Sequence, residues 1–188
     1  FSVAKLFFAY GLGNALTFPM GIGATTALFP LRPTPDSVNE IINKIKPTIL
    51  FAVPTIYAAM LVNLRKENNT NFENLRICVS AGEALPSQIG QDWKSITGVD
   101  ILDGVGSTEM LHIFLSNKPD DIVYGTSGSA VPGYKLRLVN EKNEEVHVGE
   151  IGELLVKGKS SAIAYWNKLT KSRKTFEGEW TRTGDKYE

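Results

Sequence analysis

The chain has 188 residues, which is enough to bury the core of one domain or of two subdomains that share an interface. Its 20 basic and 20 acidic side chains cancel, so no overall field attracts nucleic acid or an anionic membrane surface. We therefore expect neither partner. The single cysteine, Cys78, excludes an internal disulfide and sits in an apolar run typical of a buried core residue, which fits a cytoplasmic protein.

The two ends and the apolar N-terminal stretch suggest a piece of a longer protein without a membrane anchor. Positions 3–31 are mostly apolar but are interrupted by a lysine, glycines and a proline, so no window of about 20 residues is typical of a membrane helix. The chain starts without methionine and stops without a tail sequence. We expect both ends to have been cut from a longer chain.

The first part of the chain predicts helices and one short strand. Small and apolar residues at 9–20 predict a helix after a strand or turn, and residues 24–29 predict a strand. Thr34-Pro35-Asp36 supplies an N-cap, a proline at the first helical position and an acid in the first turn, so a helix starts there. The residues of its expected buried face are Ile41, Ile42 and Ile45.

Strands and helices then alternate up to residue 102. Apolar runs at 48–53, 75–80 and 99–102 have the length of buried strands. Prolines at 54 and 86 open helices that we expect to reach residues 66 and 97. Such alternation is typical of a parallel sheet covered on both faces.

The pattern changes after residue 117. Helical periodicity disappears, residues 134–138 alternate with period two, and an apolar run returns at 151–156 after a charged turn. The predicted fold class is α/β, with a parallel-sheet α/β subdomain at 1–120 followed by a β-rich, barrel-like subdomain at 121–188.

Distinctive residues follow three of the predicted strands, at Val53–Thr55, Ser80–Ala84 and Asp103–Glu109. Ligands of parallel sheets collect at the carboxyl ends of the strands. The third segment combines two glycines, two hydroxyls and a carboxylate, which predicts a turn that contacts a nucleotide.

Other candidate motifs are weaker. Ser107 with His112 as its base does not predict a hydrolase, because Glu109 stands where a nucleophile elbow needs glycine. The histidines and Cys78 have no zinc-site spacing. Residues 124–129 have the composition of a phosphate loop, but no Gly-Lys-Ser/Thr follows, so we expect only a loop that enters the β-rich part.

Three segments resemble successive motifs of the adenylate-forming enzymes, which include acyl- and aryl-CoA synthetases, luciferases and peptide-synthetase adenylation domains. They are Val105–Glu109, Gly149–Leu154 and Trp180–Asp185, in the order of the family. Within the family the benzoate-CoA ligases are most similar, through Phe8–Asn14, Ser80–Pro86 and Gly106–Asn117. The resemblance spans essentially the whole chain and implies part of the large N-terminal domain of an ATP-dependent, AMP-forming acid–thiol ligase.

This resemblance implies that an aromatic carboxylate, benzoate first, reacts with ATP to an acyl-adenylate and is transferred to coenzyme A. Thr108 would hydrogen-bond phosphate, and Glu109 would bind Mg²⁺ as the metal ligand; these two are the expected catalytic residues. Asp103 would accept a hydrogen bond from the adenine amino group, and Asp185 would bind both ribose hydroxyls. The remaining implied nucleotide contacts are Gly82, Glu83, Ala84, Gly104, Val105 and Ser107. The implied substrate contacts are Ala9, Tyr10, Phe18, Gly106 and His112.

Two departures from the family limit the expectation. Val105 stands where many members carry an aromatic residue that stacks on adenine, so this contact would be weaker or come from elsewhere. The phosphate loop with its lysine would precede residue 1, and a C-terminal domain with a catalytic lysine would follow residue 188. We therefore expect these 188 residues alone to be inactive. The alternatives are a ligase for another aromatic or short aliphatic acid, or a nucleotide-binding module without catalysis, and the sequence predicts no oligomeric state.

Overall fold

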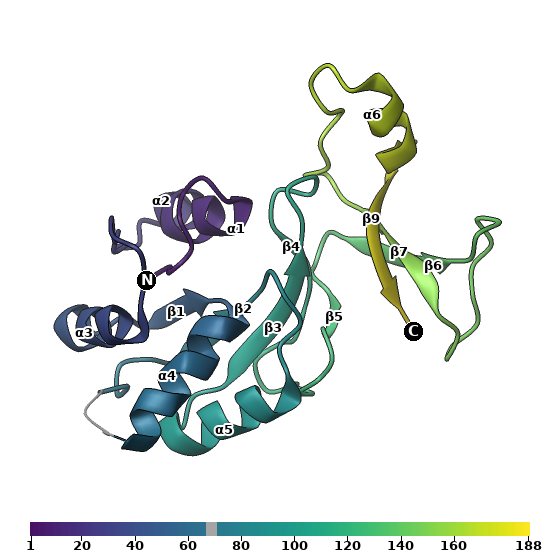
Figure 1. Ribbon diagram of the computed structural model, residues 1–188. Helices are drawn as coiled ribbons and strands as arrows, with labels where there is room; N and C mark the ends of the chain where they lie inside the picture. The colour runs from purple at the N-terminus through teal and green to yellow at the C-terminus, as the bar shows by residue number, and fades with distance from the viewer. Residues whose placement is uncertain (67–70) are drawn as a thin grey trace.

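The computed structural model describes residues 1–66 and 71–188, which form two sheets (Figure 1). The strands of the first sheet, in spatial order, are β1 (Ile49–Ala52), β2 (Ile77–Ser80), β3 (Ile101–Gly106), β4 (Ile113–Ser116) and β5 (Ser129–Ala130). The first three are parallel, whereas β4 and β5 pair antiparallel. The α/β class is confirmed, and the prediction of a parallel sheet holds for β1 to β3.

Three helices accompany the parallel strands: α3 (Pro35–Ile45), α4 (Pro54–Lys66) and α5 (Ser87–Thr97). The predicted N-cap is confirmed, because the Thr34 side chain accepts from the Ser37 amide at 3.2 Å and Ser37 Oγ accepts from the Thr34 amide at 2.9 Å. Ile42 is buried, but the prediction for Ile45 was wrong. The Ile45 side chain is 42% exposed in the last helical turn, and Lys46 after it adopts the left-handed conformation that ends the helix.

Large side chains fill the space between the parallel strands and their helices. Tyr57 and Trp93 are fully buried, with their rings edge to face at 4.9 Å. The Tyr57 hydroxyl donates to the Val79 carbonyl at 2.9 Å, which satisfies its polar end. Cys78 is buried among them as predicted, and burial raises the pKa of its thiol to about 12. It is therefore a neutral core residue.

The N-terminal segment contains a helix interrupted by a wider turn: α1 (Ala9–Leu12), a π-helical turn η1 (Gly13–Thr17) and α2 (Phe18–Ile22). The strand predicted at 24–29 is absent. The edge of β1 where it could pair is already taken, because the Val3 amide donates to the Phe51 carbonyl at 2.8 Å. Instead the ammonium of Lys5 donates to the carbonyls of Phe29 and Leu31, each at 2.5 Å.

The second sheet is antiparallel, and its strands in spatial order are β6 (Lys135–Val139), β7 (Gly152–Lys157), β9 (Trp180–Tyr187) and β8 (Phe176–Glu177). The β-rich part is confirmed, but the sequence reading missed a short helix before β8, α6 (Leu169–Thr175). A small core joins the sheets, with Met110 and Phe114 packed against Leu154 and Val156. Strand β5 lies after residue 120 but pairs with β4, which lies before it. The predicted subdomain boundary at residue 120 stays a prediction.

Among the described residues, no helix has both the length and the apolar character needed to cross a bilayer.

Candidate active site

The segment Asp103–Glu109 is a strand end followed by a turn, rather than the turn predicted throughout. Asp103 to Gly106 complete β3, because Asp103 pairs with Ser80 of β2 and Gly104–Gly106 pair with β4. Gly106 marks the change, since a Cβ there would lie 2.5 Å from the His112 carbonyl oxygen. Only a glycine lets the two strands approach this closely. The polar residues after it, Ser107 to Glu109, form the turn.

Asp103 lies within β3, and its side chain is buried. Its Oδ2 accepts from the Leu85 amide at 3.3 Å, whereas Oδ1 is buried without a partner in the protein. Burial raises the pKa of this carboxyl to about 6, against the opposing effect of the Leu85 and Gly104 amides. A buried acceptor without a donor is costly, and a ligand that supplies an N–H would remove that cost.

Both sheets contribute to a cleft of about 760 Å³ at the end of β3. Seven of the predicted site residues line it, namely Gly82, Glu83, Ala84, Gly104, Val105, Gly106 and Asp185. Its other walls, which the sequence reading did not assign to the site, are Leu115, Gly125, Thr126, Ser127, Gly128, Lys186, Tyr187 and Glu188. Segments about a hundred residues apart in the chain thus meet at one cavity whose size suits a small-molecule ligand.

The loop Gly125–Gly128 is a wall of this cleft, so the prediction of a mere connecting loop was too narrow. Asn117 shapes it, because its Nδ2 donates to the Thr126 carbonyl at 2.8 Å and its Oδ1 accepts from the Val123 amide at 3.1 Å. Ser127 Oγ lies 3.2 Å from the Tyr187 hydroxyl, which joins the loop to β9. The glycine- and hydroxyl-rich composition was the available signal, although no lysine follows it.

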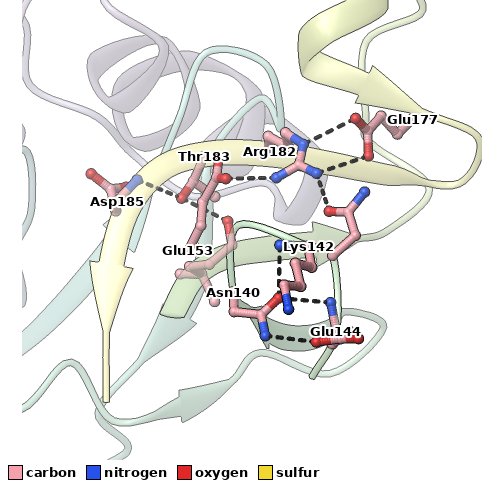
Figure 2. Close-up of polar contacts among 10 residues, drawn as sticks. Asn140, Lys142, Glu144, Glu153, Glu177, Arg182, Thr183 and Asp185 are labelled. Carbon is pink, nitrogen blue, oxygen red and sulfur yellow. Dashed lines mark hydrogen bonds and ion pairs between the residues drawn. The ribbon is translucent and has the colours of Figure 1, made fainter. Parts of the chain in front are cut away.

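Asp185 is exposed near the end of β9, and the residues before it hold the strand in place (Figure 2). The Asp185 amide donates to Thr183 Oγ1 at 3.0 Å, and Thr183 Oγ1 donates to the Leu154 carbonyl at 2.9 Å. On the same strand, the Arg182 guanidinium binds Glu153 at 2.6 Å and Glu177 at 3.1 Å, and also donates to Asn143. In Figure 2 the Asp185 side chain lies away from this network, so its carboxylate is not neutralised by Arg182.

The turn after β3 presents Thr108 at the surface and Glu109 half-buried. Ser107 Oγ accepts from the Met110 amide at 3.2 Å and so shapes the turn, and Leu111 adopts a φ of 72°, unusual for a residue with a branched side chain. Ser107 is therefore a structural hydroxyl of the turn.

Glu109 accepts a hydrogen bond at Oε1 from the hydroxyl of Tyr165, a residue that the sequence reading did not assign. Burial opposes ionisation of Glu109, but hydrogen bonds from Tyr165, from its own backbone and from Ser107 outweigh it and lower its pKa. The carboxylate is therefore ionised at neutral pH. Only the aromatic pair at 165–166 could have marked the position in the sequence.

A single carboxylate fits one kind of metal site. In residues 1–66 and 71–188, no three His, Cys, Asp or Glu side chains are grouped to hold an ion. Magnesium is commonly held through one or two carboxylates together with phosphates of the substrate, so the ionised Glu109 suits this kind of site.

Three of the predicted substrate contacts form an aromatic cluster next to Gly106. The His112 ring lies 4.7 Å from the Phe18 ring and 5.6 Å from the Tyr10 ring. A Cβ on Gly13, in the π-helical turn, would lie 2.4 Å from the His112 ring, so this turn brings the helix against it. Ala9 is half-buried at the start of α1.

His112 is a neutral group in this cluster. Burial lowers its pKa, against the opposing effect of a hydrogen bond with the Tyr10 backbone, and its Nε2 is buried without a partner. The Tyr10 hydroxyl is already occupied by the Val79 carbonyl at 3.0 Å. The cluster therefore offers flat apolar surfaces and one unused imidazole nitrogen.

The mixed α/β sheet has a cleft at its strand ends, and the second sheet adds the Asp185 carboxylate to this cleft, an arrangement that suits a nucleotide. The sequence agrees, because residues 1–166 match the family of AMP-binding enzymes, and the chain belongs to that family. The predicted recognition is thereby confirmed.

Among curated proteins, a 4-hydroxybenzoate–CoA/benzoate–CoA ligase of Rhodopseudomonas palustris is 60% identical over 187 residues, which cover 100% of this chain and 35% of that protein. A benzoate CoA ligase structure from Burkholderia xenovorans has a TM-score of 0.94 and 52% identity, covering 99% of this chain and 38% of that one. An anthranilate CoA ligase solved with anthranoyl-AMP has a TM-score of 0.95 and 48% identity, covering 99% of this chain and 36% of that one. The chain thus spans about a third of the relatives it matches.

Proposed function

We propose that this chain is the central part of an aryl-CoA ligase that activates an aromatic carboxylate, benzoate first, with ATP and transfers the acyl group to coenzyme A. The observation that carries the proposal is the cleft whose walls include Gly82–Ala84 after β2, Gly104–Gly106 of β3 and Asp185 of β9. The identity to ligases that act on benzoate supports the substrate class. A cytoplasmic location and a role in aromatic acid degradation belong to the same proposal.

The nucleotide would lie in this cleft. The backbone of Gly82, Glu83 and Ala84, with Gly104 and Val105, forms a wall against which a flat adenine can lie. The unpartnered Oδ1 of Asp103 would accept from the adenine amino group, and the two oxygens of Asp185 would accept from both ribose hydroxyls.

The phosphates would meet the turn that follows β3. Thr108 would donate its hydroxyl to a phosphate oxygen, Ser107 would keep the turn in shape, and the ionised Glu109 would hold Mg²⁺. When bound, magnesium supplies positive charge that offsets the negative charge of the phosphates while the substrate carboxylate attacks the α-phosphorus. The chain's own contribution is to position the Glu109 carboxylate and the Thr108 hydroxyl.

The aromatic acid would enter the cluster of Tyr10, Phe18 and His112, with Ala9 and Gly106 as its small walls. A neutral imidazole does not bind the substrate carboxylate as an ion pair, so His112 would act as a hydrogen-bonding or packing surface. The anthranilate relative supports tolerance of a ring substituent. Hydroxybenzoates are therefore the first alternative substrates.

The test is carboxylate-dependent exchange of labelled pyrophosphate into ATP by the full-length protein. Benzoate should support exchange better than hydroxybenzoates, and butyrate least. Glu109→Gln should lower exchange by at least about 100-fold, or roughly 2.7 kcal/mol, because the metal loses its charged ligand. Glu73→Gln, which changes an exposed carboxylate outside the site, is the matched control. Full activity of Glu109→Gln would refute the metal role, and absence of any exchange would favour a binding module without catalysis.

The 188 residues by themselves should form no thioester from benzoate, ATP and coenzyme A. By the family resemblance, the reaction also needs a lysine of a phosphate loop and a lysine of a C-terminal domain, and neither motif is found in residues 1–188. Measurable turnover by the isolated chain would contradict this expectation.

A further inference from the structure

The segment between β7 and α6 is attached to the turn that carries Glu109. The Ala162 amide donates to the Glu109 carbonyl at 2.7 Å, and Ser160 Oγ donates to the Met110 carbonyl at 2.8 Å. Figure 1 shows this segment meeting the tip of the β3–β4 hairpin. The two pieces of chain, about 50 residues apart in the sequence, are thereby held in one arrangement by bonds to the backbone.

Tyr165 follows in this segment and is itself held on several sides. Its amide donates to Ser172 Oγ at 2.9 Å, its ring lies 5.3 Å from the Phe176 ring, and the Lys171 ammonium lies 4.2 Å from its ring centroid. These contacts come from α6 and β8 and restrict how the phenol can turn. The direction of its hydroxyl is therefore set by the second sheet and its helix.

The hydroxyl donates to Oε1 of Glu109. A carboxylate has two oxygens with about four acceptor sites, so this bond leaves Oε2 available to a cation. Carboxylates that bind metals are commonly hydrogen-bonded in turn, and loss of that partner typically costs about 10- to 100-fold in metal affinity. Without the bond, the half-buried carboxylate would sample other rotamers and lose entropy on binding.

We propose that Tyr165 is a positioning residue for the metal-binding carboxylate of Glu109: its hydroxyl holds one oxygen and leaves the other for the ion. This inference rests on the proposed function, which supplies the metal role of Glu109. It assigns to the second sheet a part in the phosphate end of the site in addition to the ribose carboxylate of Asp185.

The test measures metal affinity directly in the full-length ligase. Bound Mn²⁺ is followed by electron paramagnetic resonance in the presence of an ATP analogue with a methylene bridge between the α- and β-phosphorus. Tyr165→Phe should weaken Mn²⁺ binding by about 10-fold or more. Tyr124→Phe is the matched control, because it also removes a hydroxyl that donates to a carboxylate, that of Asp100 at 2.8 Å, just before β3.

Unchanged Mn²⁺ affinity in Tyr165→Phe, or an equal loss in Tyr124→Phe, would overturn the proposal. In a Glu109→Gln background, Tyr165→Phe should cause no further loss, and a full additional loss would show that the tyrosine acts independently of Glu109. If Tyr165→Phe does not fold, Ser172→Ala frees the Tyr165 backbone and should weaken Mn²⁺ binding by a smaller factor; wild-type affinity there would be contrary evidence. Wild-type protein without pyrophosphate exchange would count against the proposed function, whereas normal exchange with unaltered Tyr165→Phe affinity would count against this inference alone.

Discussion

The two sheets are stabilised by different means, and each places a different part of the site. Around β1 to β3, large side chains such as Leu50, Tyr57 and Trp93 are fully buried. The second sheet shares a much smaller core with β4, and its strands β7, β8 and β9 are joined by the guanidinium of Arg182 (Figure 2). Packing therefore dominates the first region, and directional polar contacts are prominent in the second.

The difference between apolar packing and polar contacts matches what each region contributes to the candidate site. The first sheet presents backbone walls, such as Gly104 and Gly106, whose position must not vary, and close packing provides that rigidity. The second region presents two polar side chains at positions set by hydrogen bonds: Asp185 on β9 and Tyr165 in the segment between β7 and α6. Substitutions of the same kind should therefore have unequal effects in the two regions.

The largest effect should follow from truncation in the packed core. Trp93→Ala removes a fully buried ring that lies 4.9 Å from Tyr57 and 5.5 Å from Phe72, and it should cost about 3–5 kcal/mol of unfolding free energy. Urea denaturation of the full-length protein measures the loss. Trp166→Ala removes a ring that is 95% exposed and should change stability by less than about 0.5 kcal/mol. Comparable losses in both variants would contradict the packing argument.

A smaller effect, with a defined pH dependence, is expected at Asp103. Its pKa is raised to about 6 in the folded protein from 3.8, so the folded state binds a proton that the unfolded state has released between these values. The proton bound to Asp103 therefore stabilises the folded protein fully below about pH 4, and this stabilisation is lost as the pH rises through about 6. At pH 7, Asp103→Asn should be more stable than wild type by up to about 3 kcal/mol, because an amide carries no charge to bury.

Denaturation at several pH values checks this prediction. The stability advantage of Asp103→Asn should shrink between pH 6 and pH 4 and vanish below that range. An advantage independent of pH would show that burial does not raise the pKa of Asp103, because the folded and unfolded states would then bind the same number of protons. Asp100→Asn, which changes a more exposed carboxylate at the start of the same strand, is the control.

Arg182→Met should have an intermediate effect, because it keeps the apolar stem but removes the charge shared by Glu153 and Glu177. A loss of about 2 kcal/mol is expected, since these groups are only partly exposed and are left without their partner. ATP affinity should also fall by about 10-fold, because β9 carries Asp185, and isothermal titration calorimetry measures it. Unaltered stability and affinity would show that the backbone of β9 is held without this network.

An arginine-to-methionine substitution in the first region should have the smallest effect on stability and ATP affinity. Arg65 on α4 binds Asp92 on α5, but its side chain is 56% exposed, so Arg65→Met should cost less than about 1 kcal/mol. ATP affinity should remain that of the wild type. A loss equal to that of Arg182→Met would remove the distinction between the two regions.

The sequence by itself determined the features that depend on neighbouring residues. The starts of the helices Pro54–Lys66 and Pro35–Ile45 were predicted to the residue, because prolines and an N-cap act within one helical turn. The buried position of Cys78 also followed from its apolar neighbours. The family followed from motif order, and the roles of the site residues remain predictions.

Only the tertiary structure decided the features that depend on a distant partner. Residues 24–29 have strand composition but form no strand, because Phe1–Val3 occupies the edge of β1. Asp103–Gly106 looks like a turn but is a strand, because β2 and β4 pair with it. The meeting of Gly125–Gly128 with Asp185, and of Tyr165 with Glu109, joins segments tens of residues apart. Such contacts depend on which surfaces become buried together, and no local sequence signal encodes them.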